Sequence, residues 1–379
     1  MKIKMLNRKS LMAVCSIVVI LSVLSTIWIN PLPVSASTVW DGTVAPAFAD
    51  GDGSEGDPYQ IATAEQMARL GDWAYTWSYG DLWGQYFVLT ADIALNDISD
   101  DNWTDTAIPW TYGSWTNSTD WWCFFSGNFD GRGHVISGLY IESSMEYNGL
   151  FAGIVGNSVI KNLGIVNSYI GGINYNGAIA GTRFWGDTDT LRIENCFSDN
   201  TVTVNGWYNG GIIGLAYGNM TIKDCFSSAD LGNLENAPSG GIVGVEWGST
   251  NLNFINCYNT QPGKSMLGTN TGNAETYTGC YTTGTGATGA TELTVLQMTG
   301  AAAKTNMSAF DFDTVWYTKT GGTPALRAFW VEDVDDLFGY VTEYLLKKSV
   351  TGDFDVVEYF APKAVDIVLL LELKAEILK

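Results

Sequence analysis

The residues best suited to hydrolytic chemistry are carboxylates close to an aromatic side chain. Asp187 and Asp189 follow Trp185, with Arg183 and Arg192 on either side. Two carboxylic acids held a few ångströms apart can hydrolyse a glycosidic bond. A polysaccharide-degrading enzyme, either a lyase or a glycoside hydrolase, is therefore one alternative for this chain. No acid recurs at one position of the repeats described below, so we expect a non-catalytic protein without catalytic residues.

Other catalytic and metal-binding patterns are weak. His134 is the single histidine of the chain, so a site with several histidine ligands is excluded and a Ser-His-Asp triad would depend on this one residue. Asp50 to Asp57 has acids at alternating positions but lacks the terminal bidentate acid of a calcium loop. We expect neither a bound metal nor a cofactor, with Ca²⁺ at this loop as the alternative.

Glycine-rich segments recur at a nearly constant interval. The segment Asn148 to Gly153 returns as Asn176 to Gly181, Asn209 to Gly214 and Ser239 to Gly244, at spacings of 28, 33 and 30 residues. Each unit holds short β-rich runs between Gly, Asn and Asp corners. One unit cannot bury both of its faces, whereas stacked units can. The repeats predict a mainly β fold, a right-handed parallel β-helix.

Cysteine occupies a second repeated position, each time before an aromatic residue and, except at Cys280, after Asn or Asp. Cys196, Cys225, Cys257 and Cys280 share this position at spacings of 29, 32 and 23 residues, which do not fit a zinc site. Free cysteine is commonly buried, so we expect a ladder of inward-facing thiols. Disulfides are the alternative in an exported chain.

The residues on either side of these cysteines predict two further ladders. Asn195, Asp224 and Asn256 precede the cysteines, and these residue types tolerate tight corners. The aromatic residues that follow the cysteines should point the opposite way, because side chains alternate along a strand. They are Phe197, Phe226, Tyr258 and Tyr281.

Aromatic residues are also the candidate ligand contacts. Trp185, Tyr217 and Trp247 follow the glycine motif and each precedes a glycine, so we expect a ladder. A loop-like stretch before the repeats contains Trp103, Trp110, Trp115, Trp121 and Trp122. Flat aromatic faces stack on sugar rings, so both groups are candidates for glycan binding. Burial in the core, or closure of the solenoid end, is the alternative for each.

The chain divides into five segments. Residues 1–36 have a basic start, an apolar run and a small-residue cleavage site, as in a secretory signal peptide. We expect a cap and tryptophan-rich insertion over 37–125, repeats over 126–290, an exit segment over 291–330 and a helical tail over 331–379. Thr63 and Gln66 predict a helix to about Trp77. Further predictions are strands at 86–90 and 310–318 and a short helix at 291–298.

The charge indicates an exported protein that does not bind nucleic acid. The leader holds four of the 19 basic residues, so 15 remain against 40 acidic residues, a net charge of about −25. Such a surface repels a polyanion. We expect the chain outside the cell or on its surface. Leucine-rich faces over 332–378 could dock another protein or could cap the solenoid.

Several motifs together resemble the GLUG-motif family of bacterial and archaeal surface proteins. The repeat cores are Gly-Leu-Phe-Ala-Gly and Gly-Gly-Ile-Val-Gly. Residues 57–61 and 89–93 resemble the lead-in of that family, 129–136 its first rung, and 312–316 with 324–327 its exit. The resemblance covers about residues 52–327 and implies a secreted or surface β-helix, often associated with adhesion.

Such repeats also lie beside the catalytic domain of IgA-type metalloproteases, but this chain lacks the His-Glu-x-x-His motif. We therefore expect a scaffold or adhesin-like binding module whose partner is a glycan or a host or matrix surface.

Overall fold

The computed structural model describes residues 39–76, 82–97, 107–114, 124–184, 189–232, 238–248, 251–272, 274–284, 289–319 and 321–329. All of them belong to one compact unit, Ala36–Val331. The predicted leader, the predicted helical tail and most of the tryptophan-rich stretch lie outside the described residues. Within the described ranges, no helix is both long enough and apolar enough to span a bilayer.

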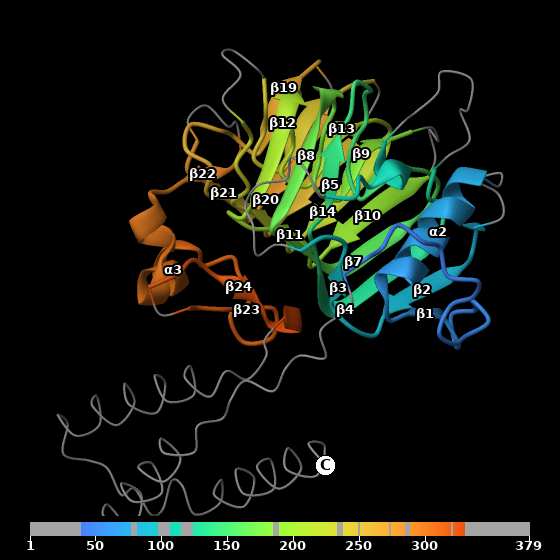
Figure 1. Ribbon diagram of the computed structural model, residues 1–379. Coiled ribbons are helices and arrows are strands. Elements are labelled where there is room, and N and C mark those ends of the chain that lie inside the picture. Colours follow the sequence, from blue (N-terminus) through green and yellow to red (C-terminus); the bar gives the residue numbers. More distant parts are fainter. Residues whose placement is uncertain are drawn as a thin grey trace, which may run out of the picture. The chain divides into compact units, whose positions relative to one another are not determined.

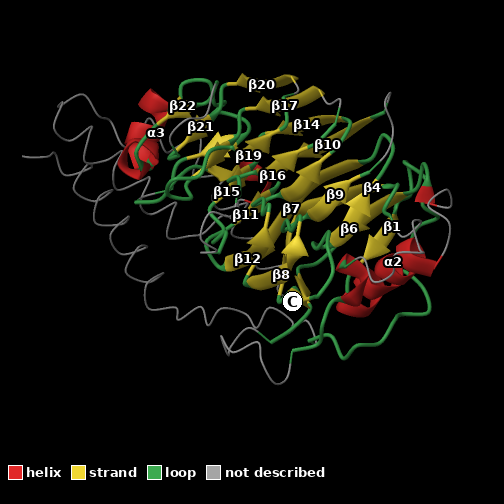
Figure 2. Cartoon of the chain, turned by 90° about the horizontal axis from the view of Figure 1, so that it is seen from above, coloured by secondary structure: helices red, strands yellow, loops and turns green. Residues whose placement is uncertain are grey.

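The repeats form a parallel β-helix, which confirms the predicted fold class (Figures 1 and 2). Strands of successive coils pair in parallel and in register, so that Ile193 lies beside Ile222, and Ile222 beside Phe254. These three side chains are fully buried and belong to the continuous core. Identical positions of the repeat therefore stack along the axis, as the sequence predicts.

The strands of each coil belong to three sheets. The largest sheet contains two rows of strands, which β4 and β7 join. Its first row is β4 (Asn128–Ser137), β7 (Val159–Val166), β10 (Thr190–Glu194), β14 (Asn219–Lys223), β17 (Asn251–Ile255) and β20 (Ala274–Thr278). Its second row continues from β7 through β11 (Phe197–Ser198), β15 (Phe226–Ser227), β18 (Tyr258–Asn259), β21 (Tyr281–Thr282) and β22 (Thr291–Glu292).

Two smaller sheets complete the coils. The groove sheet, named for the feature described below, contains β5 (Tyr140–Glu142), β8 (Ser168–Asn174) and β12 (Val202–Trp207). The motif sheet carries the glycine motif in β6 (Phe151–Ile154), β9 (Ala180–Arg183), β13 (Ile213–Ala216), β16 (Val243–Glu246) and β19 (Leu267–Asn270).

A small cap precedes the coils and pairs with them. It comprises β1 (Tyr59–Ile61), α2 (Ala64–Thr76), β2 (Tyr86–Leu89), β3 (Ile93–Ala94) and the single turn η2 (Thr111–Gly113). The predicted helix start is confirmed, because the Gln66 amide N–H donates to Thr63 Oγ1 at 3.3 Å. The Gln66 side chain accepts from the Ala62 N–H at 2.7 Å. In a standard capping box the Gln66 side chain would accept from the N–H of the N-cap residue Thr63, and here it accepts from the preceding residue instead.

The cysteine position is an interior ladder. Cys196, Cys225, Cys257 and Cys280 are buried free thiols. Cys225 Sγ lies 3.4 Å from the Cys196 amide nitrogen of the preceding coil. Burial raises the pKa of the Cys225 and Cys257 thiols well above the usual value. Because the thiolate is the nucleophile, burial lowers the reactivity expected of these two thiols.

The exit segment lies along the coils rather than across their end. The aromatic residues after the cysteines point outward as predicted, and Phe197, Phe226 and Tyr258 stack at 5.0 Å between ring centroids. Trp316 packs against Phe226 and Tyr258, and Phe329 against Phe197, so the segment covers this outer ladder. We call residues 291–329 the strap.

The strap differs from the predicted helix and strand. The expected helix at 291–298 is the short strand β22 followed by a 3₁₀ turn, and the expected strand at 310–318 is reduced to two residues. The elements after β22 are η3 (Val295–Met298), α3 (Gly300–Asn306), β23 (Trp316–Tyr317), β24 (Ala325–Leu326) and η4 (Arg327–Phe329). The outer aromatic ladder is only one residue wide. Single strap side chains such as Trp316 and Phe329 cover it from turns and short strands, without a longer helix or strand.

The corner ladder contains one missing hydrogen bond. Asn162, Asn195, Asp224 and Asn256 all adopt positive φ, between 51° and 52°. Asn195 Nδ2 donates to Asn162 Oδ1 at 3.2 Å, and Asn256 Nδ2 donates to Asp224 Oδ1 at 3.1 Å. The buried Asn195 Oδ1 has no partner among the described residues, because Asp224 offers no N–H at this position. A buried acceptor without a donor is destabilising.

We therefore expect Asp224→Asn to stabilise the protein by about 1 kcal/mol, because the new amide completes the ladder. The change removes an ion pair with Lys223 at 3.5 Å, whose exposed ammonium contributes little. Urea unfolding of both proteins measures the effect. Asn256→Asp is the matched control, and it should lower the unfolding midpoint because it removes an existing donor. A lower midpoint for Asp224→Asn would contradict this account.

Candidate functional site

The predicted tryptophan contacts do not all reach the surface. Trp110 is 1% exposed, donates its indole N–H to the Leu150 carbonyl at 2.9 Å and packs edge-on against Trp40. The prediction that Trp110 binds a glycan is therefore wrong, because its ring and its N–H are both used inside the cap. The remaining candidates of the loop and one of the ladder lie outside the described residues: Trp103, Trp115, Trp121, Trp122 and Trp185.

Tyr217 and Trp247 are exposed on neighbouring coils. Their exposed fractions are 38% and 55%, and each follows the last residue of a strand of the motif sheet. The backbone N–H of Trp247 donates to the carbonyl of Ala216 at 3.0 Å. Since Tyr217 follows Ala216, the two aromatic residues lie side by side on neighbouring coils. The repeat position before Tyr217 is held by Phe184 rather than by Trp185, because Leu215 pairs with Thr182.

A row of three tyrosines adjoins this pair and was missed by the sequence analysis. Tyr147, Tyr175 and Tyr208 adopt positive φ values of 62°, 60° and 56° at the corner before the motif sheet. Their rings stack at 5.1 and 5.3 Å between centroids. The Trp247 ring lies 6.5 Å from Tyr175. Tyr175 is buried against Leu215 and Val245, and Tyr147 and Tyr208 are half-buried beside it. We call the three tyrosines together with Tyr217 and Trp247 the aromatic surface, although only Tyr217 and Trp247 are exposed. A Tyr-Asn-Gly triplet that recurs in three repeats was the available signal.

Buried asparagines hold the tyrosine corner in place. Asn148 Nδ2 donates to Asn176 Oδ1 at 2.7 Å, and Asn176 Nδ2 donates to Asn209 Oδ1 at 3.1 Å. All three asparagines are fully buried. Ser114 of the cap extends the row through its hydroxyl, which donates to Asn148 Oδ1 at 2.6 Å. Each of these asparagines directly follows one of the tyrosines. The hydrogen bonds between their side-chain amides therefore fix the spacing of the tyrosine rings.

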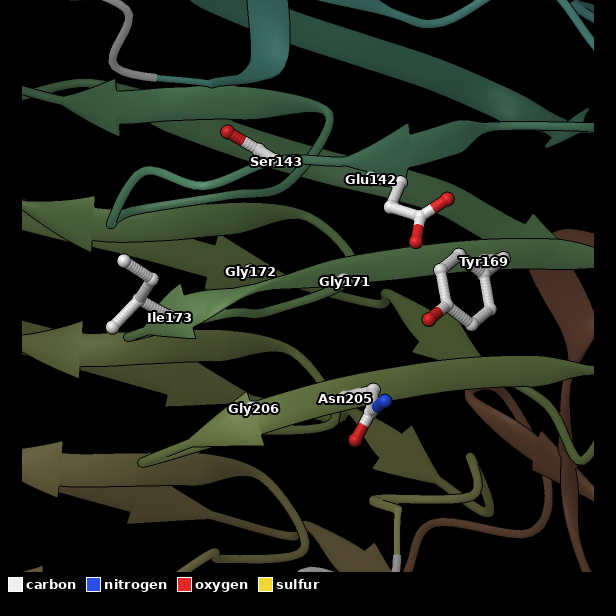
Figure 3. Close-up of a pocket in the computed structure, with 8 residues that line it drawn as sticks. All are labelled: Glu142, Ser143, Tyr169, Gly171, Gly172, Ile173, Asn205 and Gly206. Atoms are coloured by element: carbon white, nitrogen blue, oxygen red, sulfur yellow. The ribbon is translucent and has the colours of Figure 1, made fainter.

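A shallow groove of about 270 Å³ lies on the groove sheet (Figure 3). Glu142, Gly171 and Asn205 pair in register on three successive strands. Gly171 has no side chain, so Glu142 and Asn205 flank a gap, and the Tyr169 ring leans over it. A Cβ on Gly171 would lie 2.9 Å from that ring. The remaining lining residues are Ser143, Gly172, Ile173 and Gly206.

The groove presents a hydroxyl, an amide and a single carboxylate. Figure 3 shows Glu142, Tyr169 and Asn205 one above the other on neighbouring strands. The Tyr140 hydroxyl donates to Glu142 Oε2 at 2.7 Å, which orients the carboxylate. Such a set can accept from and donate to the hydroxyl groups of a sugar. Glycoside hydrolysis requires two acids, and Glu142 is the one acid among the residues that line this groove.

Among the charged residues that the sequence offers for hydrolysis, Arg183 has a structural role. Arg183 is fully buried, and its guanidinium donates to the backbone carbonyls of Asp189, at 2.7 Å, and Tyr217. Asp187 lies outside the described residues. His134 Nδ1 is 3.0 Å from Asp92 Oδ1, at the start of the first full rung.

The acidic loop considered for calcium uses its side chains locally. Asp52 Oδ1 accepts from the Ser54 N–H at 2.9 Å, and Asp50 Oδ1 accepts from the Gly51 N–H at 2.9 Å. The bonds from Ser54 lower the pKa of the Asp52 carboxyl. Across the part of the chain that the structure describes, no group of three or more His, Cys, Asp or Glu side chains is placed to hold a metal ion.

Comparison with described protein families finds none that matches this chain. Halomucin from Haloquadratum walsbyi is 29% identical over 201 residues. These make up 53% of this chain and 2% of halomucin, so the chain is similar to a small part of that protein. A solved structure from Bacteroides ovatus, provisionally named an immunoglobulin A1 protease, superposes with a TM-score of 0.47 and 19% identity. The superposition covers 74% of this chain and 95% of the other.

The Tyr140–Glu142 bond beside the groove predicts a pH effect. That bond, followed by burial, raises the pKa of Tyr140 to about 12. The unfolded phenol titrates near pH 10, so the stabilisation is complete below pH 10 and is lost as the pH rises towards 12. Tyr140→Phe lacks this contribution. The difference in unfolding free energy between the two proteins should therefore shrink by about 2 kcal/mol over this interval.

Thermal unfolding at intervals from pH 8 to pH 12 measures this difference. Burial also raises the pKa of other tyrosines, including Tyr147 and Tyr175, so both proteins should lose stability in alkali. The change in their difference is the informative quantity. A constant difference across pH 10–12 would mean that the Tyr140 hydroxyl does not bond Glu142.

Proposed function

We propose that this protein is a non-catalytic, secreted or cell-surface β-helix that acts as a scaffold and binds glycans through its outer face. The single observation that carries the proposal is the exposure of Tyr217 and Trp247 side by side on neighbouring coils. The flat apolar face of an exposed tryptophan or tyrosine suits a sugar ring, and its polar tip can remain in water. The half-buried Tyr147 and Tyr208 adjoin this pair, with the buried Tyr175 stacked between them.

A location outside the cell is supported by three independent features. The first 36 residues have the pattern of a secretory leader. The acidic surface suits a protein in salty medium. The similarity to part of halomucin is the third support. We also propose that the repeats are of the GLUG type, on the strength of the glycine motifs quoted above.

A rigid support favours binding without catalysis. Each aromatic residue of the surface lies next to a strand whose backbone bonds are made within the stack, so little conformational freedom is lost when a sugar binds. The nearby groove adds hydrogen-bonding groups that could read the hydroxyls of a polysaccharide. Its lining contains one carboxylate, Glu142, whereas a glycoside hydrolase would need two acids across the scissile bond.

A glycan array with the chain lacking its leader, with and without calcium, tests the proposal. Trp247→Ala should weaken binding to any positive glycan by about tenfold or more, because truncation of an aromatic anchor costs about 2 kcal/mol. Circular dichroism should be unchanged, since the ring is more than half exposed. Tyr217→Ala should also weaken glycan binding.

Two controls make the result interpretable. Leu296→Ala removes another exposed apolar side chain, 81% accessible and in the strap, and should leave glycan binding unchanged. Assay of the array supernatants for new reducing ends separates binding from cleavage. Release of reducing ends would favour the enzyme, and absence of binding to every glycan would contradict the proposed function.

A further inference from the structure

The outer face of the groove sheet presents a row of polar residues between two rows that carry apolar side chains. Side chains alternate along a strand, so every second residue of β5, β8 and β12 lies on this face. Strand pairing aligns these residues across the sheet. The first row is Tyr140, Tyr169 and Thr203, the second, which we call the polar row, is Glu142, Gly171 and Asn205, and the third contains Ile173 and Trp207. The groove follows the polar row, because Gly171 leaves a gap at its centre.

The polar row offers hydrogen-bonding groups that the fold does not use. Glu142 is exposed, and the Tyr140 hydroxyl donates to one of its two carboxylate oxygens, Oε2. In the described part of the chain, neither the Asn205 side chain nor the Tyr169 hydroxyl bonds another residue. Figure 3 shows Glu142 and Asn205 on either side of the bare Gly171 backbone. A carboxylate oxygen, an amide and a phenol are therefore available to a ligand, and the amide and the phenol both donate and accept.

Exposed apolar side chains border the polar row near the carboxyl ends of β8 and β12. Ile173 is 50% exposed and Trp207 is 45% exposed. Trp207 directly follows Gly206, which lines the groove together with Ile173. The Tyr169 ring borders the row on its other side. A sugar ring has an apolar face and a rim of hydroxyls, so polar groups flanked by apolar and aromatic side chains match it on both counts.

The groove sheet is acidic and has no basic residue near it in the sequence. Its three strands and the turns on either side lie within residues 135–160, 162–182 and 193–222, and these segments contain no Lys, Arg or His. They contain four acids, Glu142, Glu146, Glu194 and Asp199. Glu142 therefore faces the groove without a cation on its own sheet, and its charge favours a positively charged ligand over an anion.

We propose that the groove is a second subsite for glycans and that it takes a glycan with free amino groups, such as a glucosamine polymer. This inference rests on the proposed function and names the class of glycan. An ammonium group donates to the second oxygen of Glu142 in a charge-assisted bond. Asn205 and Tyr169 bond the hydroxyls. The polar row extends over two strand spacings, roughly 10 Å, which two linked sugar rings can span. Ile173 and Trp207 pack against the apolar faces of these rings.

Calorimetric titration of the full chain with two glucosamine oligomers of equal length tests the proposal. One oligomer has free amines and the other is fully N-acetylated, so they share a backbone and differ in charge. Below neutral pH, where the amines are protonated, the free-amine oligomer should bind at least about tenfold more tightly, because a charge-assisted hydrogen bond is stronger than a neutral one. Added salt should reduce the difference.

Glu142→Gln should lower this preference by about tenfold and leave the affinity for the N-acetylated oligomer nearly unchanged, because Gln keeps an oxygen for the Tyr140 hydroxyl. Glu292→Gln is the matched control. It removes one exposed negative charge from β22, outside the groove lining, and should leave the preference unchanged.

A second pair of variants tests the position of the ligand. Gly171→Ala places a Cβ 2.9 Å from the Tyr169 ring and fills the gap, so both oligomers should bind about tenfold more weakly. Circular dichroism checks that the variant folds. Gly56→Ala is the control, because a Cβ at Gly56 meets no atom within 4 Å, and binding should not change.

Equal affinity for the two oligomers, or a preference that survives Glu142→Gln, would overturn the inference. So would binding of hexalysine as tight as that of the free-amine oligomer, because charge alone would then explain the attraction. Loss of the preference for amines while neutral glycans still bind would contradict this inference alone. Absence of binding to every glycan would contradict the proposed function as well.

Discussion

In-register pairing of parallel strands between successive coils is the constraint on which the rest of the structure depends. Once Ile193 pairs with Ile222, the neighbouring positions of the two strands also stack, at about 4.8 Å per coil. A residue at such a position must then pack favourably against the equivalent residues of the coils on either side. Buried thiols, amides and flat rings satisfy this requirement, because each can contact a like neighbour.

The polar ladders show how strict this requirement is. An asparagine can both donate to and accept from the asparagine of the next coil, which is why Asn148, Asn176 and Asn209 can be fully buried. A carboxylate can only accept, so Asp224 interrupts its ladder and leaves the Asn195 carbonyl oxygen without a donor. The stack tolerates this interruption at a corner, where Lys223 lies nearby.

The same stacking produces the surfaces to which we assign function. The tyrosine row and the exposed pair Tyr217 and Trp247 are a ladder seen from outside, and the groove forms where a glycine interrupts another row. By contrast, the cap is assembled from loops, short strands and a helix that do not repeat. The strap belongs to neither group: it covers an aromatic row that would otherwise be exposed.

The sequence by itself determined the period, and with it the fold class. The cysteine ladder, the corner ladder of Asn195, Asp224 and Asn256 and the outward direction of Phe197 followed, because equivalent positions of stacked repeats come into contact. The start of α2 at Thr63 also followed from local chemistry. Only the tertiary structure decided which of the predicted contact residues are exposed. Trp110 looks like a surface residue in a polar loop, but the cap buries it and uses its N–H. Phe184 replaces Trp185 in the ladder because strand register, not the next tryptophan, sets the position. The cap and the strap depend on contacts between segments distant in the chain, and a repeat pattern carries no information about such contacts.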